Sequence, residues 1–258
     1  MDRAYVVTGA ASGIGAATTH YLRERGGRVI ACDLHDADVI ADLATIEGRA
    51  ALVDGVARLS GGGIDAIVAN AGGGPPETLL SLNFFGAVAT LEGLRPLLKT
   101  SPAPRAAAVS SIASIGPAVP GLVERCLSMD EPAAIAAGRD AIASGKGPLE
   151  LYGSAKVALN RWCRRVAVKA DWASAGIPLN VIAPGFIDTP AAAYILSDPE
   201  RRAAAGRMVP MLGAFPGRPE QMAAILAWCV SPENSLMTGQ ILFVDGGAES
   251  LLRGEGSW

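Results

Sequence analysis

Metal and disulfide chemistry have few residues to draw on in this chain. It has four cysteines, far apart and without a Cys-x-x-Cys pair, and only two histidines. These residues cannot form any of the familiar metal-ligand spacings, so we expect no metal site. Reduced and mostly buried thiols are expected at the four positions, Cys32, Cys126, Cys163 and Cys229.

Long basic runs and long apolar runs are missing as well. The net charge is −3 and no basic stretch stands out, so neither nucleic acid nor an anionic membrane is an expected partner. No apolar run reaches about 18 residues, the length that a membrane-spanning helix needs. A strand-like run begins near the start of the chain without a signal-peptide pattern before it, and we therefore expect a cytoplasmic protein.

Aromatic residues make up only 5% of the sequence, whereas half of it is hydrophobic and 31 residues are glycine. This composition suits a tightly turned sheet packed against helices with small side chains. A chain of 258 residues can bury one large core. We expect a single domain over residues 1–258.

Short apolar runs alternate with segments of helical periodicity along the chain. The runs that predict strands are residues 4–9, 28–33, 39–43, 64–72, 105–111, 178–185 and 240–247. The segments that predict helices are residues 14–25, 45–60, 77–99 and 152–175 and a helix after Arg218. This alternation predicts an α/β fold with one doubly wound parallel sheet of the Rossmann type and helices on both faces. Ligands are expected beyond the carboxyl ends of its strands.

Two longer segments interrupt the alternation. A connection over residues 112–150 contains a predicted helix that starts at Asp130, with Pro132 in its first turn. Because it is too long for a plain loop, we expect a helical insertion over about residues 115–149. The second segment, about residues 189–219, predicts one or two short helices at the carboxyl ends of the strands and is a candidate substrate lid.

A glycine-rich turn follows the first predicted strand and opens the first helix. Such a turn presents backbone N–H groups to a pyrophosphate and lets it approach closely. The alternative is that these glycines only mark a turn. The candidate dinucleotide-binding residues here are Gly9, Ser12, Gly13, Ile14 and Gly15.

Asp33 ends the second predicted strand, and a carboxylate there can accept hydrogen bonds from ribose hydroxyls and repel a 2′-phosphate. Neither Leu34 nor His35 supplies a cation for such a phosphate, so NAD is favoured over NADP. Asp42 and Leu43 are candidates for contact with the adenine. A ribose contact is predicted for the turn after the 64–72 strand, at Asn70, Ala71 and Gly72. Simple turn chemistry is the alternative at these positions, and a surface acid is the alternative for Asp33.

Tyr152 and Lys156 lie one turn apart on the same face of a predicted helix. A tyrosine is a poor base at neutral pH unless a nearby positive charge favours its phenolate, and Lys156 can supply that charge. Taken alone, such a pair is more often solvated helix surface.

With these features together, the chain resembles the short-chain dehydrogenase/reductase family. The resemblance rests on Thr8-Gly9-x-x-x-Gly13-x-Gly15, Asn70-Ala71-Gly72, Asn83, Ser110-Ser111, Tyr152-x-x-x-Lys156 and Pro184-Gly185 with Ile187 and Thr189. It implies a catalytic tetrad of Asn83, Ser111, Tyr152 and Lys156.

The resemblance also implies a role for each member of the tetrad. Tyr152 is the acid/base, Lys156 lowers its pKa and binds the nicotinamide ribose, and Ser111 orients the substrate oxygen. Ser110 and Ser114 are alternatives to Ser111. Asn83 would hold a water that links Lys156 to solvent, the alternative being a side-chain-to-backbone bond.

For the nicotinamide carboxamide, the resemblance implies the turn after the 178–185 strand. Its candidates are Pro184, Gly185, Ile187 and Thr189.

Ser111 and Tyr152 stand 41 positions apart, far more than in most members of that family. This spacing is similar to that of the bacterial 3α-hydroxysteroid dehydrogenase/carbonyl reductase branch, which carries a helical insertion there. The resemblance implies a homodimer, with a tetramer as the alternative.

The function expected from the sequence is an NAD-dependent oxidoreductase that interconverts a secondary alcohol and a ketone. A hydroxysteroid or another bulky alicyclic, terpenoid-like alcohol is the expected substrate, because apolar stretches flank the predicted site. Two alternatives are a 3-oxoacyl ketoreductase of the same family and a non-catalytic NAD-binding regulator.

Overall fold

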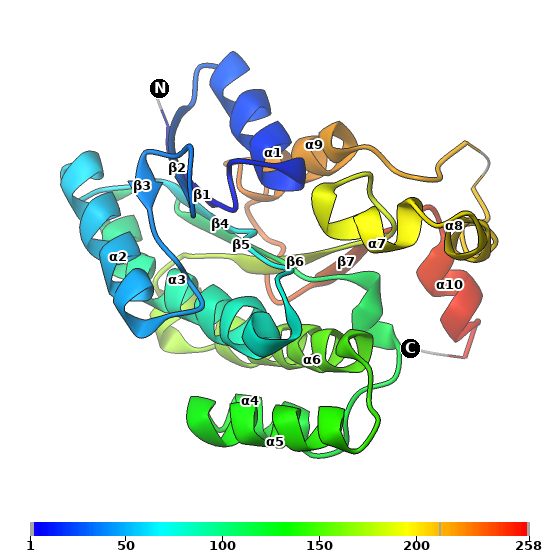
Figure 1. Cartoon of the computed structure of the whole chain (residues 1–258). Coiled ribbons are helices and arrows are strands. Elements are labelled where there is room, and N and C mark those ends of the chain that lie inside the picture. Colours follow the sequence, from blue (N-terminus) through cyan, green and yellow to red (C-terminus); the bar gives the residue numbers. More distant parts are fainter. Residues whose placement is uncertain (1–2, 212, 257–258) are drawn as a thin grey trace.

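A parallel sheet lies at the centre of the protein, with helices above and below it (Figure 1). The computed structural model describes residues 3–211 and 213–256. Residues 1–2 and 257–258 of the predicted domain and residue 212 of the predicted lid lie outside the described residues. Over the described residues the sheet has the strand order β3-β2-β1-β4-β5-β6-β7. The order reverses between β1 and β4, and a crevice for a ligand is expected beyond the carboxyl ends of these strands.

The strands follow the predicted apolar runs closely. Their bounds are Ala4–Thr8 (β1), Arg28–Asp33 (β2), Val39–Ile40 (β3), Ala66–Ala69 (β4), Arg105–Val109 (β5), Leu179–Pro184 (β6) and Ile241–Val244 (β7). Neighbouring strands pair in parallel throughout this set. The prediction for residues 39–43 was too long: after Ala41 the chain turns at Asp42, whose carbonyl accepts a hydrogen bond from the backbone N–H of Thr45.

Side chains that alternate along β1 reach two different layers of the core. Val7 packs in a cluster with residues of α1 (Gly13–Glu24) and α9 (Pro219–Cys229). Val6 packs in a larger cluster with residues of α2 (Ile46–Ser60), α3 (Ala87–Leu94) and α6 (Pro148–Ala167). Because a parallel sheet buries both faces, this arrangement confirms the predicted doubly wound fold.

The helix predicted over residues 77–99 is not one regular helix. It consists of a 3-10 turn at Pro76–Thr78, a π-helix at Ser81–Gly86, α3, and a 3-10 helix at Arg95–Thr100. The irregular part packs closely against the turn after β3, since a Cβ on Gly86 would lie 2.8 Å from the carbonyl oxygen of Leu43. π-Helices are rare and often lie at functional sites.

The helix predicted over residues 152–175 begins and ends earlier. α6 starts at Pro148, because the Glu150 carboxylate accepts a hydrogen bond from the backbone N–H of Gly147 at 2.8 Å. It ends at Ala167, and Lys169 is extended before a short π-turn at Ala170–Ser174.

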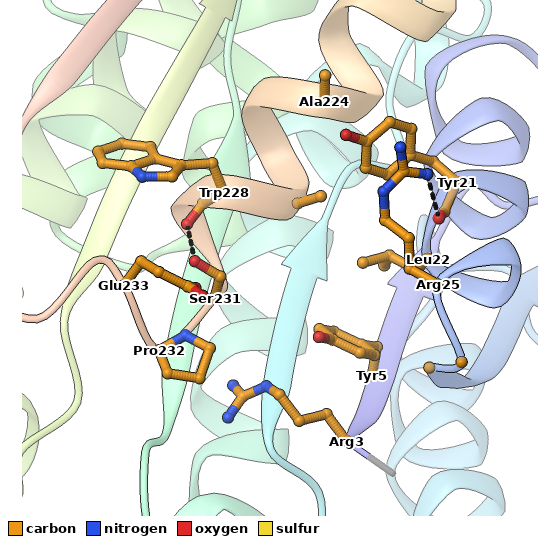
Figure 2. Close-up of a pocket in the computed structure, with 13 residues that line it drawn as sticks. Arg3, Tyr5, Tyr21, Leu22, Arg25, Ala224, Trp228, Ser231, Pro232 and Glu233 are labelled. Carbon is orange, nitrogen blue, oxygen red and sulfur yellow. Dashed lines mark hydrogen bonds between the residues drawn. The ribbon is translucent and has the colours of Figure 1, made fainter. Parts of the chain in front are cut away.

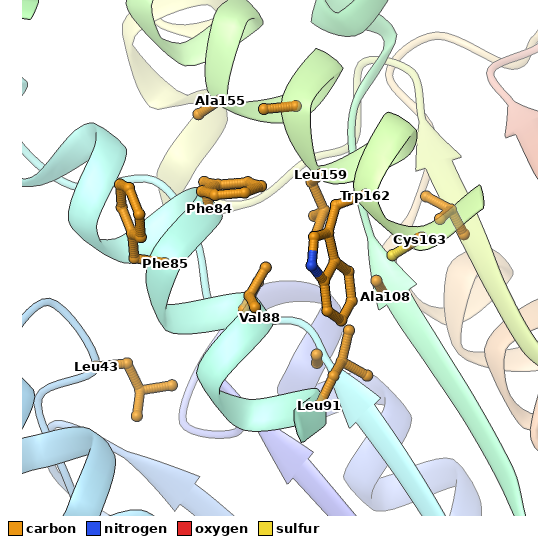
Figure 3. Packing of buried hydrophobic residues seen from close by; sticks show 14 of the residues in the cluster. Leu43, Phe84, Phe85, Val88, Leu91, Ala108, Ala155, Leu159, Trp162 and Cys163 are labelled. Carbon is orange, nitrogen blue, oxygen red and sulfur yellow. The ribbon is translucent and has the colours of Figure 1, made fainter. Parts of the chain in front are cut away.

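A core of aromatic and aliphatic side chains fixes α6 against the π-helix and α3 (Figure 3). Phe84, Leu91 and Leu159 are fully buried, and Trp162 is nearly so. Burying a side chain of this size contributes about 1.5–3 kcal/mol. This packing holds the helix that carries Tyr152 and Lys156 in a fixed position.

The insertion forms a further layer outside α6 (Figure 1). It contains a 3-10 turn at Ile112–Ile115, α4 (Leu122–Leu127) and α5 (Glu131–Ala143). The predicted start of α5 is confirmed, because the side chain of Asp130 caps the helix by accepting from the backbone N–H of Ala133. None of the helices in the described ranges is both long and apolar enough to cross a membrane.

The predicted lid holds a 3-10 turn at Pro190–Ala192, α7 (Ala193–Leu196) and α8 (Pro199–Gly206). A last helix, α10 (Ala248–Arg253), was not predicted. Its signal was Asp245, whose carboxylate accepts from the backbone N–H groups of Gly247 and Glu249. The four cysteines are unpaired and buried, as expected.

Candidate active site

The turn after β1 depends on its glycines. Gly9 and Gly13 have positive φ angles of 68° and 51°. A Cβ on Gly15 would lie 1.9 Å from the carbonyl oxygen of Gly9, so the helix and the turn touch only because this residue lacks a side chain. No acidic residue occupies the first turn of α1, and Ser12 makes no side-chain capping bond there. The N-terminus of α1 therefore suits an anionic phosphate.

The turn after β4 is bonded to the turn after β1. Nδ2 of Asn70 donates to the carbonyl oxygens of Thr8 and Gly9 at 3.0 and 3.3 Å. The Thr8 hydroxyl accepts from the backbone N–H groups of Asn70 and Ala71. The side chain of Asn70 thus holds the turns after β1 and β4 together. Ala71 and Gly72 follow Asn70 in the turn after β4.

Asp33 stands at the carboxyl end of β2, beside the glycine turn. Its carboxylate accepts from the backbone N–H of Ala11 at 2.8 Å and from that of Leu34 at 2.6 Å. The structure therefore brings Asp33 to the edge of the crevice, as predicted. The side chain of Leu34 is exposed there.

The two predicted adenine contacts differ from each other. Asp42 is exposed, and its carboxylate accepts from the backbone N–H of Ala44 at 2.9 Å. Leu43 is buried in the core below Gly86. Contact of Asp42 and Leu43 with the adenine stays a prediction.

Tyr152, Ser111 and Lys156 meet at the carboxyl end of β5. Tyr152 is half-buried on α6, and the Ser111 side chain lies close enough to lower the pKa of its phenol. Lys156 is 2% exposed, and its Nζ lies 5.6 Å from the centre of the Tyr152 ring. The same Nζ donates to the carbonyl oxygen of Val109 at 2.9 Å. A phenol, a hydroxyl and an amine are thus gathered around one point.

Burial determines the pKa direction of both titratable groups. It raises the pKa of Tyr152, and the hydrogen bond with Ser111 offsets only part of this rise. Burial also lowers the pKa of the Lys156 ammonium to about 8. The lowering of the Tyr152 pKa by Lys156 stays a prediction, and desolvation of the phenolate is the largest influence on that pKa in the folded chain.

The three candidate serines are distinguished by their hydrogen bonds. Ser111 lies near the Tyr152 phenol, and its Oγ accepts from the backbone N–H of Ala113 at 3.1 Å. The hydroxyls of Ser110 and Ser114 are buried without a partner among the described residues. Ser111 is therefore the serine that lies with Tyr152.

Close packing keeps the segment after Ser111 against α6. A Cβ on Gly153 would lie 2.9 Å from the carbonyl oxygen of Ala113. The next residue, Ser154, accepts from the backbone N–H of Val119 at 2.8 Å. The serine and the tyrosine are therefore held together by residues next to each of them.

Asn83 lies in the π-helix and binds backbone groups. Its Oδ1 accepts from the N–H of Gly73 at 2.9 Å, and its Nδ2 donates to the carbonyls of Gly73 and Leu79. A Cβ on Gly72 would lie 2.8 Å from Asn83 Oδ1 and 3.3 Å from Lys156 Nζ. Asn83 therefore lies near Lys156. Its side chain also makes backbone hydrogen bonds, the predicted alternative to holding a water. Its water-holding role stays a prediction.

The turn after β6 lies over the glycine turn. A Cβ on Gly13 would lie 3.0 Å from Cγ2 of Thr189, and Thr189 Oγ1 donates to the carbonyl of Ile187 at 3.4 Å. Gly185 packs against Asp245 in the turn after β7, and a Cβ on Gly185 would lie 2.7 Å from the Cα of Asp245. Pro184 is the last residue of β6. Of these four predicted residues, Thr189 is the one that the structure places against the glycine turn.

A cavity of about 140 Å³ lies between this turn and the lid. Its walls are mainly apolar and include Phe186, Ile187, Val209, Met211 and Ala214.

A larger cavity of about 390 Å³ lies elsewhere, between α1 and α9 (Figure 2). It is lined by Arg3, Tyr5, Tyr21 and Trp228 among others. Because Arg3 precedes β1 and Tyr5 is near its start, this cavity is at the amino ends of the strands. Ligands of open α/β sheets bind at the opposite ends, so it does not belong to the candidate site. In the part of the chain that the structure describes, no three His, Cys, Asp or Glu residues are grouped to hold a metal ion.

Comparison with known proteins identifies the family. Residues 3–122 match the family described as short chain dehydrogenase, and residues 133–249 match the one described as enoyl-(acyl carrier protein) reductase. A 3-alpha-hydroxysteroid dehydrogenase/carbonyl reductase of Comamonas testosteroni is 35% identical, over 96% of this chain and 97% of its own length. The chain belongs to the short-chain dehydrogenase/reductase family.

Two further proteins are similar to this short-chain dehydrogenase/reductase over nearly its whole length. A cis-4-hydroxycyclohexanecarboxylate dehydrogenase of Sinomonas cyclohexanicum is 31% identical, over 95% of this chain and 96% of its own. The crystal structure of a 3-alpha-hydroxysteroid dehydrogenase from Pseudomonas sp. B-0831, complexed with NADH, is 37% identical with a TM-score of 0.87. It covers 97% of this chain and 98% of that one. The predicted family, its hydroxysteroid branch and the expected oxidoreductase class are confirmed.

Proposed function

We propose that this short-chain dehydrogenase/reductase is an NAD(H)-dependent enzyme that interconverts a secondary alcohol and a ketone. The observation that carries the proposal is the grouping of Tyr152, the Ser111 hydroxyl and Lys156 at the carboxyl end of β5, where Lys156 Nζ lies 5.6 Å from the Tyr152 ring centre and donates to the Val109 carbonyl. Acid/base and hydroxyl groups at one point suit proton exchange with a substrate oxygen.

The residues around the crevice fit a nicotinamide dinucleotide. The glycine turn and the N-terminus of α1 would hold its pyrophosphate, Asp33 its adenosine ribose, and Ile187 and Thr189 its carboxamide. NADH in the similar Pseudomonas enzyme supports this assignment. When bound, the cofactor exchanges a hydride with the substrate carbon.

The protein's own groups move the proton and orient the substrate. In alcohol oxidation the Tyr152 phenolate takes the hydroxyl proton, and in ketone reduction the Tyr152 phenol returns it to the oxygen. The Ser111 hydroxyl accepts from the N–H of Ala113, so its own proton can be donated to the substrate oxygen or to Tyr152. Lys156 is cationic below its pKa of about 8 and then favours the phenolate and reaches the nicotinamide ribose.

We propose an alicyclic alcohol as the substrate class, a hydroxysteroid or a smaller ring of terpenoid type. The apolar lid residues Val209, Met211 and Ala214 line a cavity beside the turn after β6 and support an apolar ring. Two of the similar proteins carry names of enzymes for ring-bearing alcohols. The homodimer and the cytoplasmic location stay predictions, the first testable by sedimentation of the purified protein.

The substrate class is tested by following reduced nicotinamide absorbance. Purified protein is mixed with NAD and a panel of 3α-hydroxysteroids, monoterpenols, substituted cyclohexanols and, in the reverse direction, a 3-oxoacyl thioester. We expect turnover of cyclic secondary alcohols because an apolar lid favours them. Selective turnover of the thioester alone identifies the ketoreductase alternative, and no turnover of any member refutes the proposed activity.

Tyr152→Phe tests the acid/base. Removing the phenolic hydroxyl while keeping the ring should lower kcat by more than about a hundredfold, the usual contribution of a positioned acid/base. NADH binding, measured by fluorescence titration, should stay within a few-fold. Tyr21→Phe, on the far side of the sheet in the larger cavity, is the matched control and should leave kcat unchanged. A Tyr152→Phe enzyme with near-normal kcat would show that another group carries the proton.

The raised pKa of Tyr152 gives the pH dependence a direction. Oxidation needs the phenolate, so kcat/KM for an alcohol should rise with pH through that raised pKa. Reduction needs the phenol, so kcat/KM for the ketone should stay level well below that pKa and fall only as the pH approaches it. Both are measured from about pH 6 to about pH 10.5, in steps that bracket the ordinary tyrosine value. An oxidation profile that is level across this range contradicts the assignment.

Asp33→Asn tests the cofactor preference. The carboxylate beside the glycine turn should repel a 2′-phosphate, so its neutralisation should reduce the NAD over NADP ratio of kcat/KM by about tenfold or more. Asp36→Asn is the control: its side chain is 89% exposed three positions away, and it removes the same charge. Equal effects of the two substitutions would mean that general charge, not contact at Asp33, sets the preference.

A further inference from the structure

Arg49, in the first turns of α2, binds three separate parts of the protein. Its Nε donates to the carbonyl of Leu43 at 2.8 Å, and its Nη2 donates to that of Ser81 at 2.8 Å. Its Nη1 and Nη2 also form a bidentate ion pair with the Glu131 carboxylate, with N···O distances of 2.5 and 2.8 Å. One guanidinium thus joins the turn after β3, the π-helix and the insertion.

This ion pair is shielded from solvent. The side chains of Arg49 and Glu131 are 12% and 19% exposed, whereas another pair between the insertion and α6, Arg161 with Glu124, is 48% and 64% exposed. A planar fork matched to a carboxylate fixes direction as well as distance. Exposed pairs, by contrast, contribute little. Of the two pairs, the one with Glu131 can therefore hold a neighbouring segment in place.

The segments that Arg49 holds are those that border the cofactor crevice. Leu43 and Ala44 follow Asp42 in the turn predicted to meet the adenine, and a Cβ on Gly48 would lie 1.9 Å from the carbonyl oxygen of Asp42. Ser81 opens the π-helix that contains Asn83, whose amide holds Gly73 at the end of the crevice. Displacing the guanidinium would loosen both borders together.

We propose that Arg49 is a positioning residue for cofactor binding and that Glu131, at the start of α5, sets its position. The insertion thereby tunes the affinity for NAD(H) from outside the crevice, although neither residue is assigned a contact with the cofactor. This inference rests on the proposed function only in that the crevice binds a nicotinamide dinucleotide.

Glu131→Gln tests the proposal, with Glu124→Gln as the matched control in the same insertion. Glu131→Gln removes the charge that orients Arg49, and we expect the Kd for NADH to rise about tenfold, the scale of losing a fixed, preorganised contact. The Kd for ADP-ribose should rise by the same factor, because the disturbed turn is on the adenine side. At saturating NAD, kcat should stay within about twofold, and Glu124→Gln should change none of these values.

The outcomes separate the proposal from a purely structural ion pair. Equal NADH affinity in Glu131→Gln and wild type overturns it, as does a fall in kcat without a change in Kd. Arg49→Lys keeps the charge but not the fork, so it should weaken NADH binding too; normal binding in this variant also overturns the proposal. If Glu131→Gln does not fold, Glu131→Asp replaces it. The shorter side chain should also raise the Kd for NADH. A wild-type protein without NADH binding would refute the proposed function instead.

Discussion

The buried ammonium of Lys156 is the contact on which the rest of the site depends. A charged amine at 2% exposure is costly unless it is hydrogen-bonded, and the Val109 carbonyl at the end of β5 supplies that bond. This bond fixes the position of α6 along β5. Tyr152, one turn earlier on the same helix, then lies beside the hydroxyl of Ser111. The same ammonium lies beside Gly72, where the turn after β4 has no side chain to displace it. Displacement of the Val109 carbonyl would leave the charge without this hydrogen bond.

Absent side chains define the nucleotide half of the site in the same way. The first turn of α1 reaches the turn after β1 only because Gly15 has no Cβ, and Thr189 closes over Gly13 for the same reason. Asn70 then bonds the carbonyls of this turn from the neighbouring strand. Strand order places both turns at the point where the sheet reverses direction, so the crevice follows from topology and close approach together. Cofactor and proton chemistry thus share one edge of the sheet, with the β4 turn between them.

Local patterns in the sequence were enough for the strands, the glycine turn and the start of α5 at Asp130, because each depends on neighbours in the chain. Contacts across the fold account for the failures. Burial of the Leu43 side chain, beside the closely packed Gly86, could not be read from its place after a strand. The π-helix around Asn83 has no periodicity signal of its own. The pKa direction of Tyr152 depends on how much water the folded site excludes, which spacing along a helix does not reveal. The resemblance pointed to Ser111 rather than Ser110 or Ser114, and its place beside Tyr152 became visible only in the fold.

The 41 positions between Ser111 and Tyr152 raise the question of how an insertion can leave their contact intact. The segment after Ser111 contacts α6 before the insertion helices begin. Ala113 packs against Gly153, and the backbone N–H of Val119 donates to the Ser154 hydroxyl. These contacts lie directly after the serine and directly after the tyrosine, so the pair is fixed within one short closed segment. α4 starts only at Leu122, outside that segment. The length and contacts of the insertion are therefore free to vary without moving the reacting groups, and its helix α5 can make a separate connection, through Glu131 and Arg49, to the opposite end of the crevice.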